Sequence, residues 1–110
     1  MTSSKFLKPL PQYHFQRDEF VHAFYEVFTS DEIIDLDVDC SGHRVTDEFI
    51  LDRWNDEFYI IHRESGTMIN WYKHLGRTNT CNKEGFGLAD LHEFLLRLKA
   101  DLAGEMWDPE

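Results

Sequence analysis

The stretch that decides the fold is DEFILDRWNDEFYIIHRESGTMINWYKH, residues 47–74. It contains three runs rich in Phe, Ile, Tyr and Trp, which are separated by Asn55-Asp56 and by Ser65-Gly66. Short breaks of this composition between apolar runs are typical of β-hairpin turns. The stretch therefore predicts an antiparallel meander of three strands.

Two-residue turns would fix the register of this meander, so that Leu51 pairs with Ile60 and Ile60 pairs with Trp71. Side chains alternate between the two faces of a strand. One face then carries the apolar residues Phe49, Leu51, Phe58, Ile60, Ile69 and Trp71. The other face is amphipathic and carries Ile50, Asp52, Trp54, Tyr59, Ile61, Arg63, Met68, Asn70 and Tyr72. We expect the first face to form the core and the second to be partly buried or to bind a partner.

Two segments outside the meander carry apolar side chains at helical spacing, residues 16–29 and 88–103. The stripe of the first segment is formed by Phe20, Phe24, Val27 and Phe28. The stripe of the second is formed by Leu88, Leu91, Phe94, Leu95, Leu98 and Leu102. Asp90 in the first turn and Lys99 in the last turn match the helix dipole of the second segment. Both segments are therefore predicted to be helices.

Residues 30–46 allow two interpretations. Thr29 and Glu32 have the spacing of a capping box, which would open a short helix. Alternatively, Ile34, Leu36 and Val38 alternate with aspartates over residues 31–40, as in a strand. We favour a short edge strand, because charged residues on one side of an edge strand protect it from aggregation.

The order of elements predicts an α+β fold. We expect a small two-layer sandwich with an N-terminal helix, an antiparallel three- to four-stranded meander, and a C-terminal helix on the same sheet face. A length of 110 residues suits a single domain over 1–110. Residues 1–14 are expected to form an extended arm, residues 75–87 a loop, and residues 105–110 an acidic tail.

The charge balance narrows the classes of partner. Acidic residues outnumber basic ones by 21 to 11, which gives a formal net charge of -10. This argues against binding to nucleic acids or anionic membranes, because both need Lys and Arg, and it favours a basic partner. The N-terminus lacks the apolar run of a signal peptide. We therefore expect a cytoplasmic protein in which Cys40 and Cys81 are reduced thiols.

Residues 37–48 resemble the spacing of an EF-hand calcium loop, with Asp37, Asp39, Ser41 and Glu48 at ligand positions. Arg44 stands where a helix-paired loop needs an aliphatic residue, and a strand is predicted after Glu48. A calcium-binding regulatory domain is therefore the alternative function, and a solvated acidic loop is the favoured interpretation.

Other candidate sites are less specific. Cys40, His43, His74 and Cys81 include zinc donors, but their spacing fits no recognised zinc motif, and we expect no cofactor. The candidates for acid–base catalysis are His62 and His74, with Asp52 or Glu64. No nucleophile or phosphate-binding motif accompanies them, so we favour a protein that is not an enzyme. We expect His62 to be a hydrogen-bonded core or rim residue.

Ten acidic residues lie between Asp31 and Glu57, against only Arg44 and Arg53. We expect a small acidic protein-interaction module, such as an inhibitor, an immunity-type protein or a regulatory subunit, that docks on the basic surface of another protein. The expected partner-binding residues are the anchors Trp54, Tyr59, Ile61 and Tyr72 and the acids Asp52, Asp56 and Glu57.

Overall fold

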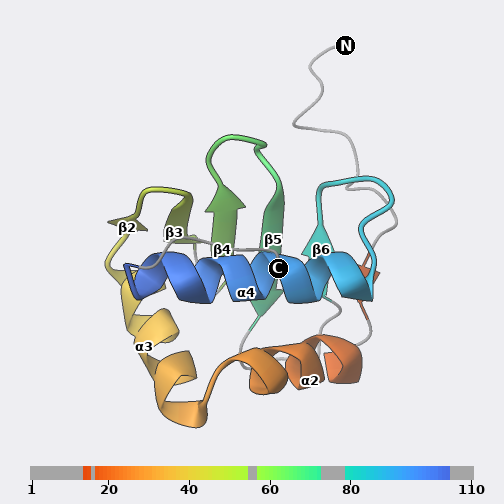
Figure 1. Cartoon of the computed structure of the whole chain (residues 1–110), viewed down its shortest axis with the longest axis horizontal. Helices are drawn as coiled ribbons and strands as arrows, with labels where there is room; N and C mark the ends of the chain where they lie inside the picture. Colours follow the sequence, from red (N-terminus) through yellow and green to blue (C-terminus); the bar gives the residue numbers. More distant parts are fainter. Residues whose placement is uncertain (1–13, 16, 55–56, 73–78, 105–110) are drawn as a thin grey trace.

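The computed structural model describes residues 14–15, 17–54, 57–72 and 79–104. Its strands are β1 (His14–Phe15), β2 (Arg44–Val45), β3 (Phe49–Trp54), β4 (Glu57–His62), β5 (Met68–Tyr72) and β6 (Asn79–Cys81). Its helices are α2 (Arg17–Val27), α3 (Ser30–Ser41) and α4 (Leu88–Leu102). The strands form one antiparallel sheet in the order β1-β6-β5-β4-β3-β2, and α4 crosses in front of it (Figure 1). The predicted α+β class is confirmed.

The predicted register is right for the first hairpin and wrong for the second. In the first, Leu51 pairs with Ile60 and Trp54 with Glu57, which leaves two residues between the strands. In the second, Ile60 pairs with Ile69 rather than with Trp71. The cause is a longer turn over residues 63–66, closed by the His62 amide donating to the Thr67 carbonyl at 2.8 Å. Because the shift is two residues, every side chain keeps its predicted face.

The two faces of the meander therefore differ as expected. The apolar residues Phe49, Leu51, Phe58, Ile60 and Ile69 of the inner face are all buried, Arg53 at its end is exposed, and the side chain of Trp71 lies outside the described residues. The outer face consists of Ile50, Asp52, Trp54, Glu57, Tyr59, Ile61, Met68 and Asn70, which are partly or largely exposed. The inner face supplies the core, and the outer face is the surface on which the predicted binding residues lie.

The edge strand predicted for residues 31–40 is instead helix α3. A capping box opens it: the Thr29 amide donates to Glu32 Oε1 at 2.8 Å, and the Glu32 amide donates to Thr29 Oγ1 at 3.2 Å. Leu36 and Cys40, four positions apart, both reach the core. In a strand Ile34 and Val38 would share their face, yet both are exposed, so the pattern of burial fits only a helix. The capping-box alternative was the correct interpretation.

The predicted loop over residues 75–87 also contains a strand, β6. Its Cys81 pairs with Ile69 of β5 and is buried, whereas β1 pairs on its other side. The sheet is therefore wider than the predicted three to four strands, and His14 of the predicted arm belongs to it. The rest of the arm, residues 73–78 and the tail at 105–110 lie outside the described residues.

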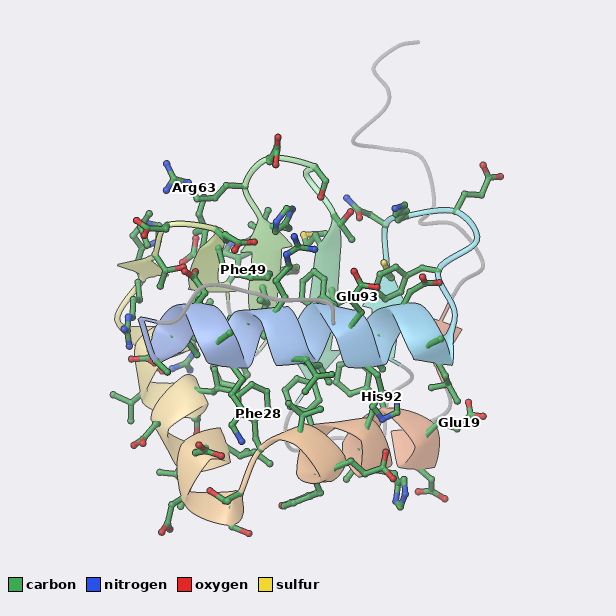
Figure 2. All side chains as sticks on the ribbon, viewed as in Figure 1. Glu19, Phe28, Phe49, Arg63, His92 and Glu93 are labelled. Atoms are coloured by element: carbon green, nitrogen blue, oxygen red, sulfur yellow. The ribbon has the colours of Figure 1, made fainter. Side chains whose placement is uncertain are left out.

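A single hydrophobic cluster joins the inner face to all three helices. Phe49 of β3 meets Phe94 of α4 edge to face, with ring centroids 5.2 Å apart. Phe24 and Phe28 bring the α2 side of the cluster to the same helix, and Figure 2 shows Phe49 and Phe28 above and below α4. Helix α4 thus packs against α2 and shares one core with the sheet.

A polar contact also ties α4 to the sheet. Asp101 Oδ2 accepts hydrogen bonds from the Thr46 hydroxyl and, at 3.0 Å, from the Glu48 amide. The Arg63 guanidinium donates to the carbonyl of Thr46 at 2.7 Å. Together these bonds hold the connection between β2 and β3 against the end of the helix.

We predict that Leu98→Ala lowers the free energy of unfolding by about 2–5 kcal/mol, because Leu98 is fully buried between α4 and the inner face. Leu96→Ala on the same helix is the matched control. Its side chain is 43% exposed, so its effect should stay within about 0.5 kcal/mol. Equilibrium urea denaturation measures both. Equal effects from the two substitutions would contradict the placement of α4.

Candidate interaction surface

The outer face gathers most of the predicted partner-binding residues. Asp52, Trp54, Glu57, Tyr59 and Ile61 all project from it, because they alternate with the inner-face residues along β3 and β4. The backbone of Tyr72 pairs with Glu57, but the Tyr72 side chain and Asp56 lie outside the described residues. Five of the seven predicted residues are thus brought to one surface.

Trp54 is the most exposed large apolar side chain on this surface. Its accessible fraction is 69%, at the end of β3, where it pairs with Glu57 across the hairpin. Asp52 lies two residues earlier on the same face. The Arg53 amide donates to its carboxylate at 2.8 Å, and His43 Nδ1 lies 3.2 Å from it, which together lower the pKa of Asp52. The indole is therefore flanked by carboxylates, and Asp52 stays ionised at neutral pH.

Glu57 organises the centre of the surface. Its Oε1 accepts hydrogen bonds from the Tyr59 hydroxyl at 3.1 Å and from the Asn70 side-chain amide at 2.7 Å. Burial, and then the nearby negative charge of Glu57, raise the pKa of Tyr59 to about 12. Tyr59 is consequently a fixed, neutral part of the surface rather than a free anchor.

The structure adds a second acidic surface that the sequence reasoning missed, on the exposed side of α3. Ile34 and Val38 are 60% and 64% exposed, one turn apart, with Asp31 and Asp35 exposed beside them. The whole helix contains five acidic residues and no basic one. The capping box could have revealed this acidic stripe of Asp31, Ile34, Asp35 and Val38, because only a helix places these four side chains together.

The calcium-loop interpretation does not match the observed geometry. Asp37, Asp39 and Ser41 lie within α3 instead of a loop, and Asp39 Oδ2 pairs with Arg44 at 3.0 Å. Glu48 points elsewhere, because its Oε1 accepts from Arg97 Nε at 2.9 Å. Among the described residues, no three His, Cys, Asp or Glu side chains come together as a metal site.

The proposed zinc donors are also dispersed. Cys40 and Cys81 are buried free thiols in the core, and burial raises the pKa of both, that of Cys40 to about 12. His43 faces Asp52 at 3.2 Å, and His74 lies outside the described residues. Thiols in this environment are poor metal ligands, because a metal binds the thiolate.

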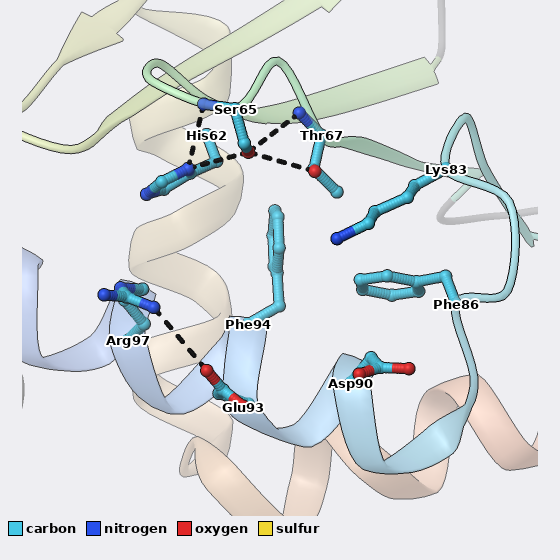
Figure 3. A pocket seen from close by; sticks show the side chains of 9 residues that line it. All are labelled: His62, Ser65, Thr67, Lys83, Phe86, Asp90, Glu93, Phe94 and Arg97. Carbon is cyan, nitrogen blue, oxygen red and sulfur yellow. Dashed lines mark hydrogen bonds and ion pairs between the residues drawn. The ribbon is translucent and has the colours of Figure 1, made fainter. Parts of the chain in front are cut away.

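His62 is a hydrogen-bonded residue at the rim of the core. Its ring contacts Phe49, with centroids 5.1 Å apart, and its two nitrogens lie 2.9 Å from Ser65 Oγ and 3.2 Å from Glu48 Oε1. Asp52 is on the opposite face of the sheet, so the structure does not bring together the proposed pair of His62 and Asp52. His62 instead lines a cavity beside α4, seen in Figure 3.

Comparisons with protein-family models, with curated proteins and with solved structures found no match to this chain.

We predict that Tyr59 makes stability depend on pH in the alkaline range. Its pKa is about 12 in the folded state against 10.0 normally, so the unfolded chain loses this proton first. The contribution is therefore complete below pH 10 and is lost as pH rises from about 10 to about 12. Denaturation of the protein and of Tyr59→Phe across this range measures it. The wild type should lose more stability than the variant, and parallel losses would contradict the assignment.

Proposed function

We propose that this protein is a protein-interaction module, an inhibitor, an immunity-type protein or a regulatory subunit, that docks on the basic surface of a partner protein. The observation that carries the proposal is the exposed indole of Trp54 between Asp52 and Glu57 on a sheet face. Tryptophan is the side chain most enriched among residues that dominate binding energy. Fixed on a strand, it loses little conformational freedom on binding.

Charge supports a basic partner. The net charge of -10 attracts cationic surfaces over a distance of about one Debye length, roughly 10 Å at 0.1 M salt. The carboxylates next to Trp54 then give the contact its specificity, because they favour Lys or Arg around the pocket that receives the indole. The acidic stripe on α3 adds to the same long-range field.

The alternative function, calcium binding, has less support. The residues of the proposed calcium loop are divided between a helix and an ion-pair network with Arg97. In the part of the chain that the structure describes, no helix combines the length and the apolar character needed to cross a membrane.

We predict that Trp54→Ala weakens partner binding by about 2 kcal/mol or more, roughly 30-fold, and leaves stability almost unchanged. The control is Tyr25→Ala, which removes an aromatic side chain that is 57% exposed on α2. The wild type, Trp54→Ala and Tyr25→Ala would each be used as bait in affinity capture from the source cells at low salt. Calorimetry on the captured protein then gives each dissociation constant.

The proposal requires a partner that the wild type and Tyr25→Ala retain and that Trp54→Ala loses. If all three baits retain the partner equally, the interface does not lie on the outer face. If Trp54→Ala unfolds the domain, the indole is a structural residue and the proposed interface is wrong.

We predict that Asp56→Lys, two positions after Trp54 in the sequence, mainly slows association. Reversing a charge beside the anchor weakens long-range attraction, which acts on the association rate more than on dissociation. Glu84→Lys makes the same charge change in the segment before α4 and is the control. Stopped-flow or surface-based kinetics should show that added salt reduces the difference between Asp56→Lys and wild type. A defect confined to dissociation would argue that Asp56 makes a direct contact instead.

A further inference from the structure

The cavity beside α4 is built from three segments that are distant in the sequence. The turn after β4 supplies Ser65 and Thr67, the segment between β6 and α4 supplies Lys83 and Phe86, and α4 supplies Glu93 and Phe94. The cavity has a volume of about 210 Å³ and opens to solvent (Figure 3). It is separate from the outer face, and none of the residues proposed to bind a partner lines it.

The walls of the cavity are held in place before any ligand arrives. Asn82 joins the two loops: its side-chain amide donates to the Gly66 carbonyl at 3.1 Å, and its Oδ1 accepts from the Met68 amide at 2.8 Å. Gly85 has a φ of 78°, a backbone conformation that other residues rarely adopt, and it allows the chain to turn toward α4. Preorganisation of this kind reduces the entropic cost of binding a small molecule.

One side of the cavity offers hydrogen-bond donors and a positive charge. The Ser65 hydroxyl donates to Thr67 Oγ1 at 3.0 Å and lies 2.9 Å from His62 Nδ1, so it is fixed, and the proton of the Thr67 hydroxyl is left for a ligand. In Figure 3 the Lys83 side chain reaches from its loop toward the space beside Thr67 and Phe86. The Lys83 ammonium next to the Thr67 hydroxyl suits a carboxylate.

The opposite side, on α4, offers carboxylates. Asp90 and Glu93 are three positions apart on the helix and both line the cavity. Asp90 Oδ2 accepts from the Gly87 amide at 2.9 Å, which orients the group at the start of the helix. Glu93 Oε2 lies 3.6 Å from Arg97 Nη1, a loose pair in which the carboxylate keeps capacity for another donor. Arg97 also lines this side, but its charge is shared by Glu93 and by Glu48, whose Oε1 lies 2.9 Å from Arg97 Nε, so the carboxylates still suit an ammonium group.

Two aromatic rings lie between these poles. Phe86 and Phe94 are buried apart from their edges at the cavity, with centroids 6.1 Å apart in an edge-to-face arrangement. They provide an apolar floor between the basic and the acidic side. Drug-sized ligands occupy pockets of roughly 300–1,000 Å³, so a smaller cavity selects a smaller molecule.

We propose that this cavity binds a small zwitterion, an amino acid with a short aliphatic body, whose carboxylate lies at Lys83 and Thr67 and whose ammonium lies at Glu93 and Asp90. The net charge of the chain works against a simple anion, and the Lys83 side works against a simple cation. A molecule that carries both charges on an apolar body satisfies all three parts of the cavity.

The test is an NMR titration of the full chain, following backbone amide shifts. The probes are leucine and 5-aminopentanoate, which differ in the separation of their charges, each compared with its N-acetylated form and its carboxamide. At least one zwitterion should give saturable shifts confined to the cavity, and both of its blocked forms should bind about tenfold more weakly or less well. Equal binding of a zwitterion and its blocked forms, or no saturable shift at the cavity with either probe, would overturn the proposal.

Variants assign the two poles. Lys83→Gln should abolish the preference for the zwitterion over its carboxamide, and Glu93→Gln should abolish the preference over its N-acetylated form. Glu84→Gln, an exposed acid next to Lys83 that does not line the cavity, is the matched control and should bind as the wild type does. The poles are assigned wrongly if Lys83→Gln and Glu93→Gln each weaken all three probe forms to the same extent. These outcomes are independent of whether Trp54 binds a partner.

Discussion

The structure depends on the packing of α4 against the inner face of the meander. Leu91, Leu95 and Leu98 are fully buried on this helix, and Phe94 meets Phe49 of the sheet. A chain of 110 residues has room for one core, so each further element is stable only through contact with this interface. Helix α2 joins the same cluster through Phe20 and Phe24, and α3 joins it through Leu36 and Cys40.

Local signals predicted those parts of the fold whose pattern has a single interpretation. Strand alternation placed the described side chains of β3, β4 and β5 on the correct face, and the leucine stripe placed α4 within one residue. The second turn was mispredicted because Ser65-Gly66 suits a two-residue turn equally well. The observed turn is longer, since the Ser65 hydroxyl accepts from the Thr67 amide and contacts His62. A shift of two residues leaves the hydrophobic pattern unchanged, so the pattern could not detect it.

Tertiary contacts decided the remaining elements. For residues 31–40, helix and strand were both compatible with the local sequence, and burial of Leu36 and Cys40 with exposure of Ile34 and Val38 decides for the helix. Strand β6 is short and polar, and it exists because β5 and β1 pair with it. The candidate sites follow the same rule. The alternation of side chains along the strands was enough to predict which residues surround Trp54. The cavity could not be predicted, because it is formed by segments that no sequence pattern links. Both outermost strands, β1 and β2, have only two residues, which leaves few unpaired backbone groups at the edges.

The two cysteines link folding to oxidation. In the folded chain both thiols are buried, and the high pKa of Cys40, about 12, makes its reactive thiolate scarce. Each unfolding event exposes two ordinary thiols to oxidants. A glutathione adduct or a sulfinic acid at either position would place polar bulk in a close-packed core, so the modified chain could not regain its packing. Under oxidative stress, the lifetime of this protein is therefore set by how often it unfolds.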